Sequence, residues 1–133
     1  MLLEIYLSQV RAAKALEIIT QHQAKVSSWL LSIEVSIVLR RVLNRSAKDK
    51  NLLTAAMKRL QKDLTAISLF DGLPILADRI NEESKFARCR ALDAIHVASA
   101  MLIRDLTGQN MQIATFDNRV ADLANSLGLA VVL

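Results

Sequence analysis

Apolar positions along the chain switch between helical spacing and short continuous runs. Ala12, Ala15, Leu16 and Ile19 have the i, i+3, i+4, i+7 spacing of an amphipathic helix, so the N-terminal third is predicted to be helical. Further helices are predicted where this spacing recurs, and strands where short apolar runs lie between them. The predicted strands are 25–27, 66–70, 112–116 and 129–133, and the predicted later helices are 28–43, 47–64, 73–80, 91–104 and the segment after Asp117.

Strands separated by helices are typical of an α/β fold with a short parallel sheet. The chain has only three Gly and one Pro, and so few turn-forming residues argue against a sandwich or a barrel. Its 133 residues contain no repeat and no Gly/Ser-rich linker. We therefore expect residues 1–133 to form a single helix-rich domain.

Composition excludes several other classes of protein. Hydrophobic residues make up 53% of the chain, which excludes disorder, and the single cysteine, Cys89, excludes a disulfide framework. The longest apolar stretch, 26–39, contains Glu34 and is too short to span a membrane. With no signal-peptide pattern at the N-terminus, we expect a soluble cytoplasmic protein with no membrane contact.

Basic residues are concentrated in one segment. The formal net charge is +4, and eight of the 17 Lys and Arg residues lie between positions 40 and 62, opposed only by Asp49. A basic stripe predicts a phosphate-bearing partner such as RNA, while a solvated surface of two helices is the alternative. The eight residues are Arg40, Arg41, Arg45, Lys48, Lys50, Lys58, Arg59 and Lys62.

Glu34 is an acidic residue in an apolar part of its helix. It lies about 200° around the helix from Ser36, and its neighbours one turn away are Leu30, Leu31, Ile37 and Val38. A carboxylate in such a stripe is costly unless it is paired or binds a metal ion. A functional site is favoured, and a buried salt bridge to Arg41 is the alternative.

Asp93 and Asp117 each stand at the start of a predicted helix. An acid in the first turn favours the helix dipole, and Asp is a preferred N-cap, so both positions have a purely structural explanation. Asp117, however, also follows a predicted strand, and ligands of parallel α/β sheets bind at the carboxyl ends of strands. Glu34 follows another strand end by one to two turns. Carboxylates that converge there would suit Mg²⁺ or Mn²⁺.

The chain resembles a PIN domain of the VapC toxin type. The similar segments are Ser28–Val35, Arg90–Ala100, Ala114–Asp117 and Ala124–Val131, in the family's order and spacing. The resemblance implies a three-layer α/β/α fold and RNA cleavage dependent on Mg²⁺ or Mn²⁺, in a toxin held by an antitoxin protein. It implies that Glu34, Asp93 and Asp117 are catalytic metal ligands and that Thr115 is the hydroxyl residue beside the last acid.

The chain departs from this family at its N-terminus. PIN domains begin with a strand that ends in a metal-binding Asp, and no Asp precedes Asp49 here. Residues 1–7 then resemble the first helix after the missing strand; in the alternative they form a shortened strand in which Glu4 replaces the Asp. A missing central strand would expose apolar surface, so we expect a homodimer or a bound partner that involves the N-terminal helices.

Two functions compete at this point. The first is a metal-dependent endoribonuclease of a toxin–antitoxin system, weakened by the missing Asp. The second is a catalytically inactive PIN-like module that binds an antitoxin or RNA, with Arg40, Arg41 and Arg45 as contacts. A nucleotide-binding α/β domain is disfavoured because the chain lacks a glycine-rich phosphate loop.

Overall fold

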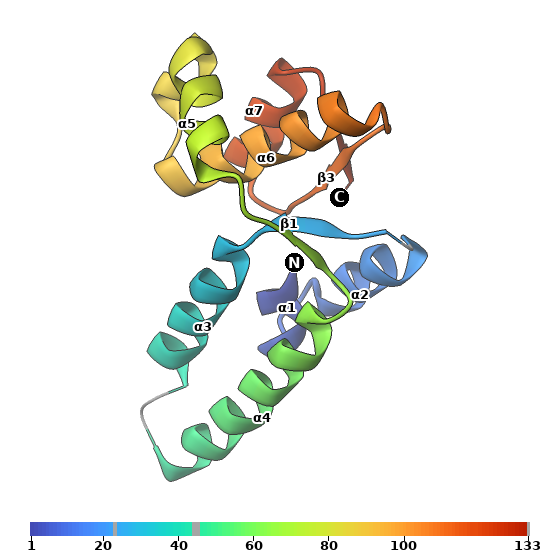
Figure 1. Cartoon of the computed structure of the whole chain (residues 1–133). Coiled ribbons are helices and arrows are strands. Elements are labelled where there is room, and N and C mark those ends of the chain that lie inside the picture. The colour runs from blue at the N-terminus through green and yellow to red at the C-terminus, as the bar shows by residue number, and fades with distance from the viewer. Residues whose placement is uncertain (23, 44–45, 133) are drawn as a thin grey trace. The chain divides into compact units, whose positions relative to one another are not determined.

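The computed structural model describes residues 1–22, 24–43 and 46–132, which form two compact units (Figure 1). Unit 1 comprises Met1–Leu69 and unit 2 comprises Phe70–Leu133. In the described part of the chain, helices predominate and four short strands form two small parallel sheets, so the fold is helix-rich α/β. The expectation of one PIN-like domain over residues 1–133 stays a prediction.

Unit 1 is mostly helical. Helices α3 and α4 run side by side, α1 packs against α2 and α3, and β1 pairs with β2 at the edge of the unit (Figure 1). The pairing of these strands includes the hydrogen bond from the backbone N–H of Ser68 to the carbonyl of Lys25, at 2.8 Å. The elements are α1 (Leu2–Tyr6), α2 (Ala12–Gln21), β1 (Val26–Ser28), α3 (Leu30–Val42), α4 (Ala47–Leu64) and β2 (Ser68–Phe70), whose last residue, Phe70, is the first residue of unit 2.

The core of unit 1 lies between α1, α3 and α4. Leu39 is completely buried and Val35 is 3% exposed, and both face the buried side chains Leu2, Ala56 and Leu60. Burial of aliphatic side chains of this size contributes about 1.5–3 kcal/mol each, which holds the helices together. The start of α4 is fixed by Ser46, whose Oγ accepts the backbone N–H of Asp49 at 3.1 Å.

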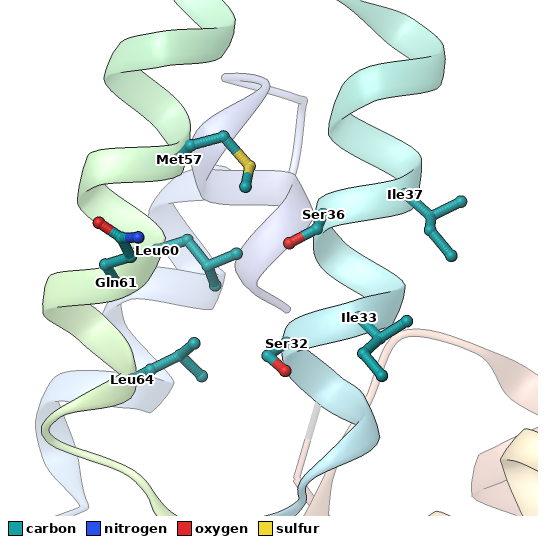
Figure 2. A pocket seen from close by; sticks show the side chains of 8 residues that line it. All are labelled: Ser32, Ile33, Ser36, Ile37, Met57, Leu60, Gln61 and Leu64. Atoms are coloured by element: carbon teal, nitrogen blue, oxygen red, sulfur yellow. The ribbon is translucent and has the colours of Figure 1, made fainter.

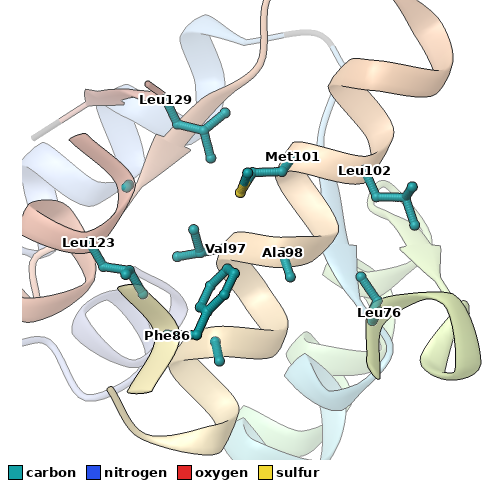
Figure 3. Packing of buried hydrophobic residues seen from close by; sticks show 10 residues of the cluster. Leu76, Phe86, Val97, Ala98, Met101, Leu102, Leu123 and Leu129 are labelled. Carbon is teal, nitrogen blue, oxygen red and sulfur yellow. The ribbon is translucent and has the colours of Figure 1, made fainter. Parts of the chain in front are cut away.

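Unit 2 is organised around α6. Its small and aliphatic residues, among them Val97, Ala98 and Met101, pack against Phe86, Leu123 and Leu129 from the surrounding elements (Figure 3). Strands β3 and β4 pair in parallel, with Ile113 opposite Val131. The elements are α5 (Leu73–Glu82), the 3₁₀ helix η1 (Ser84–Arg88), α6 (Ala91–Thr107), β3 (Gln112–Ala114), α7 (Asn118–Ser126) and β4 (Ala130–Val132).

Glycines end two elements of unit 2. Gly108 follows α6 with φ +66°, and Gly128 follows α7 with φ +76°. Both lie in the left-handed region that favours glycine. The chain can therefore turn sharply from each helix into the following strand.

Most predicted helices are confirmed, and some boundaries differ. The helix at 47–64 is confirmed, and residues 1–7 contain the helix α1, so the alternative of a strand carrying Glu4 is wrong. The sequence also predicts Ser27 or Ser28 as the cap of the helix at 28–43. This prediction is wrong, because the N-cap residue of α3 is Trp29 and its side chain makes no capping bond. Each predicted strand is confirmed only as a three-residue strand, and η1 was not predicted.

Candidate functional site

Asp117 connects the sheet of unit 2 to a helix. It lies three residues after β3 and is the N-cap of α7, where its Oδ1 accepts the backbone N–H of Arg119 at 2.9 Å. The Thr115 hydroxyl accepts the backbone N–H of Asp117 at 3.1 Å, which fixes the turn after the strand. The structural role considered for Asp117 is thus confirmed, and its carboxylate lies beyond the carboxyl end of β3.

Arg119 engages both oxygens of that carboxylate. Its Nη2 is 3.0 Å from Oδ2 of Asp117, and its Nε is 3.3 Å from Oδ1. The Arg119 side chain, with the Arg119 backbone N–H, holds the pKa of Asp117 below its usual range. The pKa of Arg119 is raised in return, first by Asp117 and also by the negative charge of Asp93.

Asp93 lies in the first turn of α6 and is half-buried. Its charge acts on Arg119, and it also helps to raise the pKa of the Cys89 thiol, for which burial is the larger cause. The Asp117 carboxylate thus contacts the Arg119 guanidinium directly, whereas Asp93 adds only a smaller electrostatic effect on it. Sequence reasoning missed Arg119, although a cation in the first turn of a helix opposes the helix dipole and was a usable signal.

Glu34 lies in unit 1, on α3. The buried stripe of this helix is Leu31, Val35 and Leu39, and the half-buried Glu34 flanks it rather than lying within it. The expected convergence of Glu34 with Asp93 and Asp117 stays a prediction, as does its alternative pairing with Arg41.

The packing of α3 explains why its buried apolar stripe differs from the stripe predicted around Glu34. Ser32 and Ser36 point towards α4, where with Met57, Leu60 and Leu64 they line a cavity of ≈ 360 Å³ (Figure 2). The Ser32 hydroxyl donates to the carbonyl of Trp29 at 3.0 Å, so it can face a neighbouring helix without an unsatisfied donor. Ile33 and Ile37 point away from α4 and are exposed (Figure 2).

The donor set of unit 2 suits a hard cation only in part. Mg²⁺ keeps several waters and is commonly bound by one or two carboxylates together with substrate phosphates, and Asp93 and Asp117 supply two carboxylates. No group of three or more His, Cys, Asp or Glu side chains among the described residues is arranged to hold a metal ion. Asp93 and Asp117 therefore stay predicted ligands, and the metal site stays a prediction.

The basic stripe is exposed in unit 1. Arg40 and Arg41 at the end of α3 are exposed, as are Lys48, Lys50, Lys58, Arg59 and Lys62 on α4. Arg45, the third arginine predicted to contact RNA or a partner, lies outside the described residues. The solvated alternative and the phosphate-binding role both require this exposure, so the stripe stays a candidate.

An apolar groove lies beside this stripe. It has a volume of ≈ 620 Å³, and its walls come from α1, the turn after it, the end of α3 and α4. Arg59 lies at its edge, 5.6 Å above the ring of Tyr6, and the Tyr6 hydroxyl donates to Asp63 at 2.8 Å. The lining apolar side chains include Ile5, Leu7, Val42, Leu43 and Leu52, of which Val42 and Leu52 are exposed.

No protein-family model matches the chain, and neither a curated protein nor a solved structure is significantly similar to it. No helix within the described residues is both long enough and apolar enough to cross a membrane.

Proposed function

We propose that the chain is a PIN-like, metal-dependent endoribonuclease with weak activity. The observation that supports this proposal best is that the Asp117 carboxylate lies just beyond the carboxyl end of β3. This is the position where α/β folds bind ligands. A three-layer PIN-like arrangement that adds Glu34 as a third carboxylate belongs to the same proposal.

Each residue of the proposed site has a definite task. Asp93 and Asp117 would hold Mg²⁺ or Mn²⁺, which when bound lowers the pKa of a coordinated water and neutralises phosphate charge. The Thr115 hydroxyl keeps the turn that directs Asp117, through the 3.1 Å bond to its backbone N–H. Exposed cations of α3 and α4 bind the RNA backbone.

The test is cleavage of a labelled single-stranded RNA by the full chain with Mg²⁺ or Mn²⁺. We expect slow cleavage that stops in EDTA and in Asp93→Asn and Asp117→Asn. Asp122→Asn is the matched control, because Asp122 is an exposed acid on α7 that has no part in the proposed site. Cleavage that persists in EDTA, or an Asp93→Asn variant with wild-type rate, would refute the metal mechanism.

A second candidate is a binding module without catalysis. Two observations favour it: Arg119 already pairs with both oxygens of Asp117, and unit 1 carries an apolar groove whose lining includes Arg59. In this case the module binds RNA or an antitoxin protein, the latter with apolar residues in the groove. RNA binding that is unchanged by EDTA, with no cleavage in Mg²⁺ or Mn²⁺, would select this candidate.

Assembly and location complete the proposal. A cytoplasmic homodimer, or a complex with an antitoxin, would cover exposed apolar side chains of the groove such as Val42 and Leu52. Light scattering at micromolar concentration tests the dimer. A dimer that becomes monomeric in Val42→Ser with Leu52→Ser would support the groove as the contact, whereas a monodisperse wild-type monomer would contradict the dimer.

A further inference from the structure

The apolar groove of unit 1 leaves large hydrophobic side chains exposed. It has a volume of ≈ 620 Å³, and of its lining residues Val42 is 43% exposed and Leu52 is 49% exposed. This volume lies within the range of ligand sites in proteins. Exposed apolar surface with a polar rim marks an interaction site, and the shape and charge of the groove indicate the kind of partner.

Helix α4 determines the shape of the groove. Its lining residues have the i, i+3, i+4, i+7 spacing of one helix face, over about 10 Å of helix, and they are Leu52, Ala55, Ala56 and Arg59. Because Ala55 and Ala56 have small side chains, space for larger apolar side chains remains between Leu52 and Arg59. Two turns of a partner helix present apolar side chains at the same spacing, so a helix matches this face.

The groove face of α4 is basic. Lys48 lies one turn before Leu52 on this face, Lys62 lies one turn after Arg59, and both lysines are exposed. The Arg59 side chain is 51% exposed, and its contact with Asp63 is long, at 3.6 Å, so it stays available to a second carboxylate. The whole helix carries five Lys or Arg and two Asp. The complementary partner is therefore acidic.

We propose that the apolar groove binds an acidic amphipathic helix of a partner protein. Apolar side chains of that helix fill the space above the two alanines, while carboxylates along its edge contact Lys48, Arg59 and Lys62. RNA is a poor occupant of the groove itself, because burying phosphates against an apolar lining is costly. The inference deepens the binding-module candidate of the proposed function, on which it rests, and it does not depend on a metal site.

The test is fluorescence anisotropy of labelled peptides titrated with the full chain, without RNA or divalent metal. The first peptide has about 18 residues, enough to form a helix, with Leu at i, i+3, i+4 and i+7 and with Glu and Ala elsewhere. One control peptide has the same composition with its leucines dispersed around the helix, and another has Lys in place of Glu. We expect the first peptide to bind about tenfold more tightly than either control, because it alone matches both spacing and charge.

Variants of the chain locate the contact. Leu52→Ser, and Lys48→Gln combined with Lys62→Gln, should each weaken binding of the first peptide about three- to tenfold. Lys50→Gln is the matched charge control, because Lys50 is exposed on the opposite side of α4 from Leu52. Leu106→Ser, which changes an exposed leucine of unit 2, is the apolar control. Both controls should bind within about twofold of the wild type, and far-UV circular dichroism checks that every variant is folded.

The outcomes separate this inference from the proposed nuclease. If the first peptide fails to bind, or the control peptides bind equally well, the acidic-helix proposal is overturned and RNA cleavage, which is tested with metal, is unaffected. If labelled RNA also fails to bind, the binding-module candidate is wrong as well. A wild-type dimer that the peptide neither binds nor dissociates, and that becomes monomeric in Val42→Ser with Leu52→Ser, assigns the groove to a second copy and overturns the proposal.

Discussion

At the scale of single residues, Asp117 combines two roles that substitutions can separate. Its Oδ1 caps α7, and both of its oxygens carry the charge that the proposed site needs. Asn caps a helix about as well as Asp, whereas Ala does not. The structural role and the charge are therefore tested by different variants of the same residue.

We expect Asp117→Ala to destabilise the protein by about 1 kcal/mol, because the cap is lost. Asp117→Asn should change the melting temperature by less than about 2 °C at neutral pH, since it keeps the cap and loses only an exposed ion pair. Thermal unfolding monitored by circular dichroism checks both. An Asn variant as unstable as the Ala variant would show that the charge, not the cap, stabilises α7.

Lowering the pH should reduce the difference in melting temperature between the wild type and Asp117→Asn. The pKa of Asp117 is lowered in the folded chain, first by the Arg119 side chain. The stabilisation from the charged form is thus present above the unfolded pKa of about 3.9 and is lost as the pH falls through the lower folded value. Melting temperatures measured from pH 6 down to pH 2.5 should converge, and a constant difference would contradict this linkage.

The contribution of Tyr6 to folding stability depends on pH in the opposite direction from that of Asp117. Burial, followed by the hydrogen bond to Asp63, raises the pKa of its phenol above the ordinary value of 10.0. The stabilisation from the protonated Tyr6 phenol is thus complete below about pH 10 and declines above it. The reason is that the phenol ionises at a lower pH in the unfolded chain than in the folded chain.

We expect Tyr6→Phe to lower the free energy of unfolding by about 1 kcal/mol at pH 7, where the wild type has an intact hydrogen bond to Asp63. The loss should shrink as the pH rises from 9 to 11, because the wild type then loses stability that the variant never had. Urea unfolding at both ends of this range checks the prediction. A loss that is independent of pH would show that the phenol stays out of the linkage.

At the scale of elements, the sequence predicts helices better than strands or contacts. Helix α4 is predicted at 47–64 and confirmed there, and the Ser46 cap that fixes its start is a local feature of the chain. The strands are only three residues long and each pairs with a single neighbour, and apolar runs in the sequence do not encode how long a pairing lasts.

The candidate site likewise divides into local features that the sequence predicts and contacts that it does not. The helix-start roles of Asp93 and Asp117 follow from local sequence and are confirmed. The action of Asp93 on Arg119 could not be predicted, because it depends on how α6 packs against α7. The prediction that Glu34 lies within the apolar stripe of α3 was wrong for a related reason. A serine such as Ser32, whose hydroxyl bonds the carbonyl of Trp29, can line the contact with α4, and the pattern of apolar residues alone does not show this.

Helix α3 provides a test of its observed orientation. Leu39 is fully buried and Ile37, two positions earlier, is 50% exposed. Leu39→Ala should cost about 2–5 kcal/mol because it leaves a cavity in the core of unit 1. Ile37→Ala is the control on the same helix and should cost less than about 1 kcal/mol in the monomer. Urea unfolding checks both, and equal losses would mean that α3 is rotated from the orientation described.

At the scale of the whole molecule, charge is divided unevenly between the two units. Residues 1–69 carry 11 of the 17 basic residues and a net charge of +6, whereas residues 70–133 carry a net charge of −2. The basic stripe thus belongs to unit 1, and the aspartates of the proposed metal site belong to unit 2. RNA affinity and metal affinity should therefore respond to different substitutions.

The salt dependence of RNA binding tests this division. Lys48, Lys58 and Lys62 are exposed on α4, and each neutralises a phosphate if the stripe binds RNA. Substitution of each by Gln should reduce the slope of log affinity against log salt by about 0.7, the value for one contact to a single strand. Fluorescence anisotropy with a labelled RNA, without divalent metal, measures the slope.

Lys14→Gln is the control for these variants, because Lys14 is an exposed lysine on α2 that pairs with Glu17 at 3.3 Å and lies outside the stripe. It lowers the net charge by the same amount and should leave the slope unchanged. If Lys14→Gln reduces the slope as much as the α4 variants, binding depends on total charge alone. If no variant changes the slope, the stripe is the solvated surface of two helices, and the phosphate-binding role assigned to it is wrong.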